Sequence, residues 1–346
     1  MKLEPLVLKN LVMSIGGFLL SCPKWLVVKY PLFCSHKRVD VWSCENTEVE
    51  MVVKKLNSVG RFRNSFELIY GNGTKMLVSD ELMLDSVIQL LHGSKDGMPE
   101  PFEFVKILTY LDKSDSPIVK ENIMMVELLF YNYIRHDVNL RHFQLFYGIL
   151  HNPSTMLELI KLAWLPDNEQ AKEIRKNEFA KNKNLSSIAK IALEILHGLE
   201  AQPCENNNGV VNGQDLKKYA KELLEAAKSE YLERPAMYVI GKLLGNINLG
   251  EDYPPPYLGE ILEELDKDEI DDEYRRQLFN RHGFTCRAYN EGGTIERKRE
   301  KKFLSYAEKT RFTYDRITIV FEKLASEYHH MGDREDVNAK LEDLDN

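Results

Sequence analysis

Apolar positions recur at steps of three and four residues along most of the chain, with Lys and Glu filling the positions between them. Leu216, Tyr219, Leu223, Ala227 and Tyr231 show this pattern clearly. The spacing places the apolar side chains on one face of an α-helix. The same periodicity predicts helices over 47–58, 60–71, 79–92, 100–112, 116–136, 139–150, 185–198, 233–245, 256–268, 296–310 and 312–331.

A further helix start can be assigned to individual residues. In the stretch "NPSTMLELIKLAWL", Asn152 is a suitable N-cap and Pro153 occupies the first helical position, where its missing N–H is tolerated. Met156 and Trp164 lie on the apolar stripe that follows. Strand-like alternation occurs only in "RVDVWS" at 38–43, which is too short to form a sheet by itself.

The helices are separated by short breaks such as "GNG" at 71–73 and "YPPPY" at 253–257. A run of antiparallel helices can bury its apolar stripes in a closed bundle or in stacked hairpins. So many helices in 346 residues exceed what one bundle usually holds. We therefore expect an all-α fold of stacked antiparallel helical hairpins, an α-solenoid or repeat-like array, with a C-terminal helical cap.

One stretch suggests a domain boundary. "AQPCENNNGVVNGQ" at 201–214 holds four asparagines and two glycines, which favour turns over helix. It is predicted to be an exposed loop between a helical repeat array over 1–200 and a C-terminal helical unit over 215–346. The second unit contains a basic loop at 275–302.

Composition favours a soluble, cytoplasmic protein. The formal net charge of −8 disfavours nonspecific binding of the whole molecule to nucleic acid or to an anionic membrane. The five cysteines form no CxxC pair, which is typical of reduced thiols in a cytoplasm. An apolar run ending at Cys22 resembles a secretion signal, but Pro23 and Lys24 keep it too short to span a membrane, and a buried helical hairpin is the preferred interpretation.

No catalytic signature is found in the sequence. GxxxxGK[ST], HExxH and GxSxG are all absent, and the nine histidines are scattered. We therefore predict no enzymatic activity, no cofactor and no metal. The aromatic run "LLFYNYIRHDVNLRHFQLFYGIL" could stack nucleic-acid bases, but its helical spacing favours a packing role.

Charge is strongly segregated near the C-terminus. From Arg275 to Arg311 there are eleven Lys or Arg against four Asp or Glu, and from Glu260 to Glu273 there are nine acids and one lysine. Three interpretations of the basic block remain open: it binds a phosphate or another polyanion, it neutralises the acidic helix, or it docks onto an acidic surface of another protein. The candidate binding residues are Arg281, Arg287, Gly292, Gly293, Arg297 and Lys298.

The two glycines also predict local backbone geometry. Gly292 and Gly293 permit a positive φ where the chain reverses, and Thr294 is predicted to cap the helix that follows.

The segment "FNRHGFTCRAYNEGGTIERKREKKFLSYAEKTRFTYDRITIVFEKLASEYHHMGDREDVNAKLED" resembles the extreme C-terminal region of large, uncharacterised bacterial multidomain proteins. "LNSVGRFRNSFELIY" and "HNPSTMLELIKLAWLP" resemble earlier helices of the same family. The family is similar in layout to NTPase proteins of the defence or signalling kind, whose C-terminal part is a helical repeat array. Arg281 and His282 depart from the family pattern, which has serine and arginine at that turn.

The resemblance and the residue patterns together favour a non-catalytic helical scaffold or sensor module. It would bind a protein partner, or an NTPase or effector module encoded elsewhere, and the chain would correspond to part of a larger bacterial protein. The alternative is a nucleic-acid-binding helical protein that uses the basic segment 275–311. A phosphate binder would lose affinity steeply as salt rises, which separates the two hypotheses.

Overall fold

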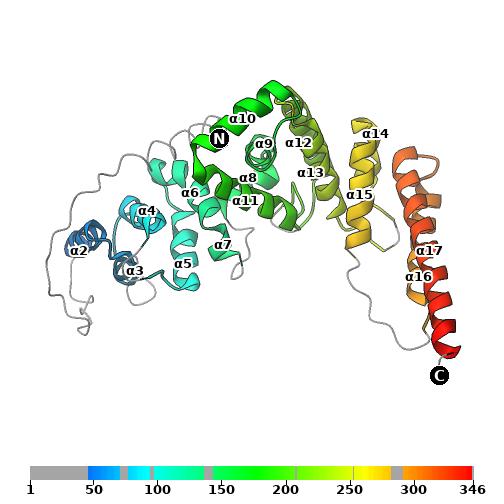
Figure 1. Ribbon diagram of the computed structural model, residues 1–346, viewed down its shortest axis with the longest axis horizontal. Coiled ribbons are helices and arrows are strands. Elements are labelled where there is room, and N and C mark those ends of the chain that lie inside the picture. The colour runs from blue at the N-terminus through cyan, green and yellow to red at the C-terminus, as the bar shows by residue number, and fades with distance from the viewer. Residues whose placement is uncertain are drawn as a thin grey trace. The chain divides into compact units, whose positions relative to one another are not determined.

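The computed structural model describes residues 46–70, 77–93, 97–135, 143–206, 209–251, 253–281 and 291–344 (Figure 1). The predictions for the apolar run before Cys22, for 38–43 and for Arg287 lie outside these residues. The described part is all-α, and its one β-type pairing is an isolated antiparallel bridge between Glu205 and Val211. The predicted fold class is confirmed.

The chain divides into two compact units, one formed by Met1–Ile149 with Lys181–Ala192 and the other by Leu150–Ala180 with Leu193–Asn346. The helix α11 (Lys183–Gly198) begins in the first unit and ends in the second. The other helices of the first unit are α2 (Asn46–Ser58), α3 (Phe62–Tyr70), α4 (Asp80–Gln89), the 3-10 helix η2 (Leu90–His92), α5 (Pro101–Leu111), α6 (Pro117–Leu129), α7 (Tyr131–Ile134) and most of α8 (Gln144–His151).

Aromatic side chains form the centre of the first unit. The ring of Phe104 on α5 stacks on Phe66 of α3 with 5.7 Å between centroids, and it lies 4.5 Å from the ring of Phe130. Phe104 is fully buried, as are Ile107 of the same helix and Val87 of α4. Burial of such side chains is the main stabilising contribution to the unit.

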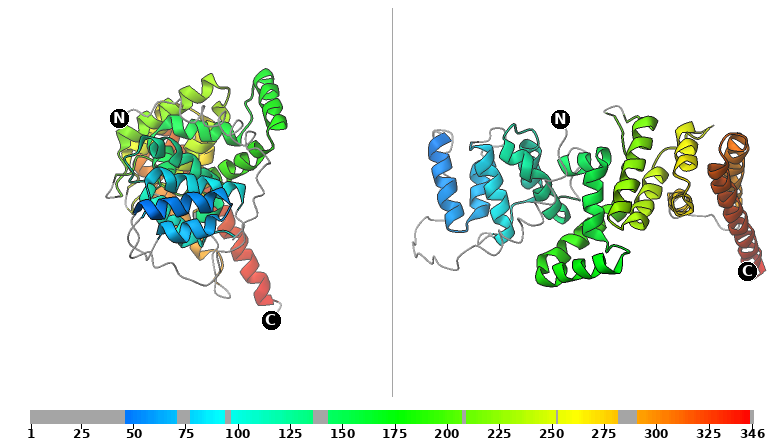
Figure 2. Two further views of the ribbon diagram at one scale, coloured as in Figure 1. Left: turned by 90° about the vertical axis from the view of Figure 1, so that its left-hand side faces the viewer. Right: turned by 90° about the horizontal axis from the view of Figure 1, so that it is seen from above.

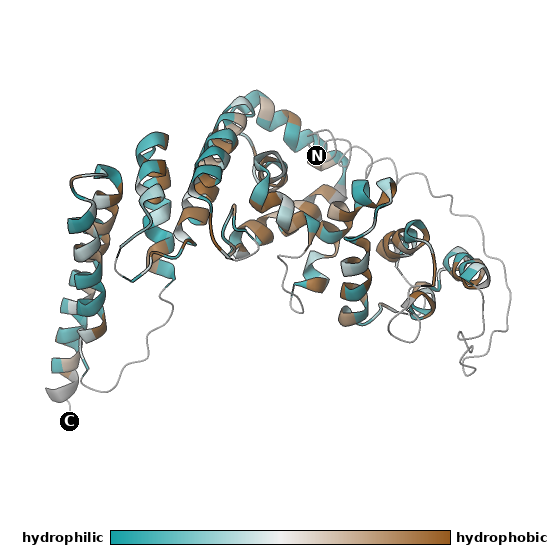
Figure 3. Cartoon of the chain, turned by 180° about the vertical axis from the view of Figure 1, so that it is seen from behind, coloured by the Kyte–Doolittle hydropathy of each residue, from teal (hydrophilic) through white to brown (hydrophobic). Residues whose placement is uncertain are grey.

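Stacked hairpins are clearest in the second unit. α12 packs on α13, α12 also contacts α14, α13 contacts α15, and both α14 and α15 contact α17. The hairpin of α12 and α13 thus lies on α14 and α15, first helix on first and second on second, whereas α14 and α15 both lie on α17. The hydrophobic faces of the ribbons supply the packing surfaces (Figure 3). The helices of this unit are α9 (Pro153–Ala163), α10 (Glu169–Lys181), α12 (Gly213–Ser229), α13 (Glu233–Gly245), α14 (Pro256–Leu265), α15 (Asp268–Asn280), α16 (Thr294–Thr310) and α17 (Asp315–Leu344). The last residue of α10, Lys181, belongs to the first unit.

Glycines allow α13 and α15 to approach closely. A methyl group at Gly245 would lie 2.5 Å from Cβ of Gln277, and one at Gly241 would lie 2.7 Å from the carbonyl oxygen of Ile270. Such distances are far below van der Waals contact, so only glycine fits at these two positions. The backbones of the two helices can therefore pack with little space between them.

Several predicted boundaries are confirmed. α13 covers the predicted range, and α9 begins as expected: Pro153 is its first residue and Oδ1 of Asn152 accepts a hydrogen bond of 3.0 Å from the amide of Ser154. α10 was not predicted. It is mostly polar and buries none of its residues, so it lacks the broad apolar stripe on which the predictions depend.

Candidate functional site

Arg281, the first predicted binding residue, caps a neighbouring helix. Its Nη1 donates to the carbonyl oxygen of Gly245 over 3.0 Å and to that of Ile247 over 2.7 Å. These oxygens lie at the end of α13, where carbonyl groups lack partners within the helix. The guanidinium of Arg281 therefore serves the internal structure of the second unit.

Arg297 is surrounded by acidic groups. Its Nη2 donates to a carboxylate oxygen of Asp333 and, over 3.1 Å, to one of Asp336, while its Nη1 lies 3.4 Å from a carboxylate oxygen of Glu300 and 3.0 Å from Nδ1 of His329. The hydrogen bond to Asp333 is the largest of several effects that raise the pKa of Arg297 above its usual value. This group, called the Arg297 cluster below, ties α16 to α17.

The two glycines complete the same junction. Gly292 has a φ of +56°, as predicted, whereas Gly293 has a φ of −82° and is needed for a different reason. A methyl at Gly293 would lie 2.4 Å from the carbonyl oxygen of Gly332, and the Gly293 amide donates to Asp336 over 2.7 Å. The predicted cap at Thr294 is wrong: Thr294 is the first helical residue, and its hydroxyl donates to the carbonyl oxygen of Glu291 over 2.8 Å.

The predicted residues therefore do not form one site. Gly292, Gly293 and Arg297 meet at α17, the long helix drawn in red in both views of Figure 2. Arg281 instead contacts the end of α13. Lys298 is exposed on α16.

The acidic block finds its positive partners mainly outside the basic block. Arg316 of α17 lies 2.7 Å from a carboxylate oxygen of Asp268 and 2.7 Å from one of Asp271, and Lys217 and Lys221 of α12 pair with Glu264. Pairing between the two blocks themselves is local, as between Arg276 and Glu273 at 2.8 Å. Among the described residues, the acidic block is thus paired mainly with Arg316, Lys217 and Lys221, and with the basic block only through neighbours in sequence.

The exposed lysines of α16 form a basic face. Lys298, Lys301 and Lys302 are exposed and lie on the side of the helix opposite the buried Phe303 and Ala307. Lys309 is exposed further along the same face. Among the acids of α16, Glu296 is buried and Glu300 belongs to the Arg297 cluster, so Glu308 is the helix's remaining exposed acid.

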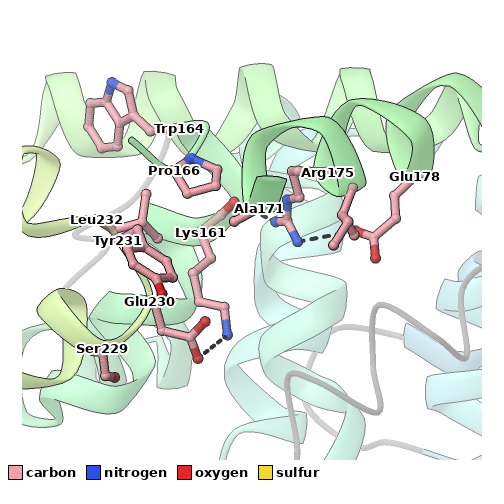
Figure 4. Close-up of a pocket in the computed structure, with 11 residues that line it drawn as sticks. Lys161, Trp164, Pro166, Ala171, Arg175, Glu178, Ser229, Glu230, Tyr231 and Leu232 are labelled. Carbon is pink, nitrogen blue, oxygen red and sulfur yellow. Dashed lines mark hydrogen bonds and ion pairs between the residues drawn. The ribbon is translucent and has the colours of Figure 1, made fainter. Parts of the chain in front are cut away.

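A pocket lies between α10 and the loop that joins α12 to α13 (Figure 4). It encloses about 240 Å³, and its apolar lining comes from Trp164, Pro166, Ile174, Tyr231 and Leu232. This volume matches one or two large side chains rather than a cofactor, since ligand pockets usually hold about 300–1,000 Å³. We call it the α10 pocket.

Ion pairs flank the α10 pocket. Lys161 Nζ lies 3.0 Å from a carboxylate oxygen of Glu158 and 3.5 Å from one of Glu230. Arg175 of α10 donates to the carbonyl oxygen of Lys161 and lies 3.5 Å from Glu178 (Figure 4). Both cations are thus held in place, and the pocket is apolar with balanced charges at its rim.

Two aromatic neighbours fix one wall of the pocket. The ring of Trp164 lies 5.9 Å from Tyr238 in an edge-on arrangement and 6.3 Å from His197. Aromatic contacts of this kind hold a ring in one orientation. The wall is therefore formed before any ligand arrives.

Tyr231 has an unusual backbone at the pocket. It follows the end of α12 with a φ of +57°, and the amide of Leu232 donates to the carbonyl oxygen of Ala227 over 2.9 Å. This is the left-handed position after a helix that glycine normally occupies. The sequence pattern placed Tyr231 on the buried stripe of its helix, and this prediction is wrong: its side chain is 53% exposed.

A buried glutamate and a half-buried aspartate lie together in the first unit. Glu127 is fully buried, and its side chain accepts hydrogen bonds from the amides of Leu145 (2.6 Å) and Gln144 (3.3 Å) at the start of α8. Burial, followed by a hydrogen bond that the protonated Glu127 donates to Asp112, raises the pKa of Glu127 well above its usual range. The pair has a structural explanation, because it caps a helix N-terminus.

The packing role predicted for the aromatic run is confirmed for most of its described rings. Phe130, Tyr131, Phe143 and Phe146 are buried, whereas Tyr147 is 57% exposed. In the part of the chain that the structure describes, no group of three or more His, Cys, Asp or Glu side chains could hold a metal ion. Over the same residues, every helix is too short or too polar to cross a lipid bilayer.

These features define an all-α protein of stacked helical hairpins with an apolar surface pocket and a basic outer helix face. No protein-family model matches the chain, and neither does any curated protein or any solved structure.

Proposed function

We propose that the chain is a non-catalytic helical scaffold or sensor module of the cytoplasm that binds a protein partner through the α10 pocket. The partner contributes a peptide segment with one bulky apolar side chain, which enters between Trp164, Ile174 and Tyr231. Such an anchor matches the pocket in size and polarity, and its backbone lies between the ion pairs at the rim.

The conformation of Tyr231 carries this proposal. A non-glycine residue in the left-handed region costs of the order of 1 kcal/mol or more. Glycine would end α12 in the same way without that cost. The backbone at this position therefore does not require tyrosine, whereas the tyrosine ring lines the pocket. Residues held in such conformations cluster at binding sites.

α10 supports the same conclusion. None of its residues is buried, Ile174 is 57% exposed, and the helix is 13 residues long. Isolated helices shorter than about 12–15 residues are marginal in water, because most helical stability comes from burial of an apolar face. A partner segment in the pocket would cover Ala171 and Ile174 and so stabilise α10.

Selection of a phage-displayed random peptide library on the full chain tests the proposal. We expect enriched peptides to share one bulky apolar residue and to bind Ile174→Asp at least 10-fold more weakly. Asn177→Asp, an exposed change on α10 outside the pocket lining, serves as the matched control and should leave binding unchanged. Equal binding to both variants, or no enrichment, would show that the pocket is not a peptide site.

A further inference from the structure

We infer that the solvent face of α16 is a second docking surface, which takes an acidic protein segment with an apolar anchor at one end. The surface consists of Lys298, Lys301, Lys302 and Lys309, together with Phe312 in the turn that follows the helix. It is distinct from the α10 pocket, and the inference does not depend on that pocket.

The charge of this face requires an explanation beyond solubility. The outermost helix of a stacked array needs a polar outer side, but it does not need a single sign of charge. Lys298 is three residues from Lys301 and four from Lys302, and like charges at these spacings destabilise a helix slightly. Alternating Lys and Glu would give an equally polar face without that repulsion, so an acidic occupant accounts for the excess.

Several arginines of the basic block are paired with acids of α17. Arg297 is held by acids of α17, Arg275 by Glu327, and Arg311 lies 2.9 Å from a carboxylate oxygen of Glu322. The lysines of the solvent face are exposed and are therefore better placed than these arginines for an external contact. A lysine ammonium is a point charge on a flexible stem and can pair with carboxylates in many geometries. The planar guanidinium of arginine instead favours a fixed bidentate arrangement.

Phe312 provides the apolar component. Its side chain is 95% exposed, the largest value among the exposed apolar residues of the described part, and it lies three residues beyond Lys309. Aromatic side chains are enriched at the centres of protein interfaces, whereas the charged residues around them set the orientation. A lysine row that ends at an exposed ring thus fits a segment with an acidic stretch and an apolar residue at one end.

A nucleic acid is the less suitable occupant. A strand would need several phosphate contacts to overcome the repulsion from a chain of net charge −8. The acids Asp333 and Asp336 also lie close by, in the Arg297 cluster. A protein segment can place its acids on the lysines and keep its neutral part over these carboxylates.

The test uses the full chain and a fluorescein-labelled 20-residue peptide rich in Glu with one terminal Leu. We expect saturable binding that weakens at least 10-fold in Lys298→Glu/Lys301→Glu and about 3-fold in Phe312→Ser. Lys218→Glu/Lys228→Glu on α12 changes the net charge by the same amount at exposed positions and should bind like the wild type. All substituted positions are exposed, and circular dichroism should show unchanged helix content.

Any result other than these overturns the inference. Equal weakening in the α12 variant would mean that only net charge matters. Tighter binding of the 20-nucleotide oligomer dT20 than of the peptide would indicate a nucleic-acid surface instead. This test does not depend on whether the α10 pocket binds a peptide, because Ile174→Asp should leave binding of the acidic peptide unchanged.

Discussion

Gly293 at the start of α16 and Gly332 in the middle of α17 touch backbone to backbone: a methyl on Gly293 would lie 2.4 Å from the carbonyl oxygen of Gly332. The contact brings Arg297 within reach of Asp333 and Asp336 and makes the Gly293 amide a donor to Asp336. Two small residues, 39 positions apart in sequence, therefore allow Arg297, in the first turn of α16, to pair with acids of the adjacent α17.

Gly293→Ala should weaken this junction. The added methyl forces α16 away from α17, and overpacking of this kind typically lowers the free energy of unfolding by about 1–3 kcal/mol. Urea denaturation of the full chain measures the change. Lys298→Ala, on the exposed side of the same helix, is the control and should stay within about 0.5 kcal/mol of wild type. Equal stability of Gly293→Ala and wild type would contradict the close approach.

Tyr231→Gly should separate stability from binding. Glycine relieves the left-handed strain, so the chain should be as stable as wild type or more stable by up to about 1 kcal/mol. The same change removes one wall of the α10 pocket and should abolish binding of the selected peptides. Urea denaturation and fluorescence anisotropy give the two readouts. A loss of stability together with retained binding would mean that the tyrosine serves the fold.

Arg281→Met should destabilise the end of α13. The carbonyl oxygens of Gly245 and Ile247 lose their donor, which typically costs about 1 kcal/mol. Arg334→Met removes the same charge from an exposed position of α17 and serves as the control in thermal unfolding. If both variants unfold at the same temperature, Arg281 is not a structural cap.

Glu127 should make stability depend on pH. Because burial raises its folded pKa above the unfolded value, the folded state holds a proton that the unfolded state releases. This stabilisation of the folded state is present in full below the unfolded-state pKa of Glu127, and it is lost as pH rises through the folded-state pKa. Between the two values, the free energy of unfolding falls by up to about 1.4 kcal/mol per pH unit for one proton.

Glu127→Gln mimics the protonated group and should remove this part of the slope. Its carbonyl oxygen can still accept from the Leu145 amide, and its amide can donate to Asp112. Asp271, whose pKa burial raises to about 6, adds a slope of its own, so the difference between variant and wild type is the quantity to measure. Asp85→Asn, at an exposed position of α4, should leave the wild-type slope intact. An unchanged slope in Glu127→Gln would refute the assignment.

The success of the helix predictions follows from how each helix is stabilised. α13 and α9 carry broad apolar stripes, and their limits or caps were predicted correctly. α10 has no stripe and was missed. α17 was predicted to end at 331 but continues to Leu344, because beyond that point its apolar residues, such as Val337 and Leu341, are sparse and exposed.

The sequence alone determined that the chain is all-helical and that charge is segregated near its C-terminus, because periodicity and composition are local properties. Only the tertiary structure decided which of the charged side chains are held by partners within the protein. Arg281 and Arg297 contact residues outside their own helices that lie 32 to 39 positions away in sequence, and only helix packing brings these residues together. The α10 pocket likewise depends on a helix with no apolar stripe and on a tyrosine in a glycine position, and neither feature can be recognised before α10 and the end of α12 lie side by side.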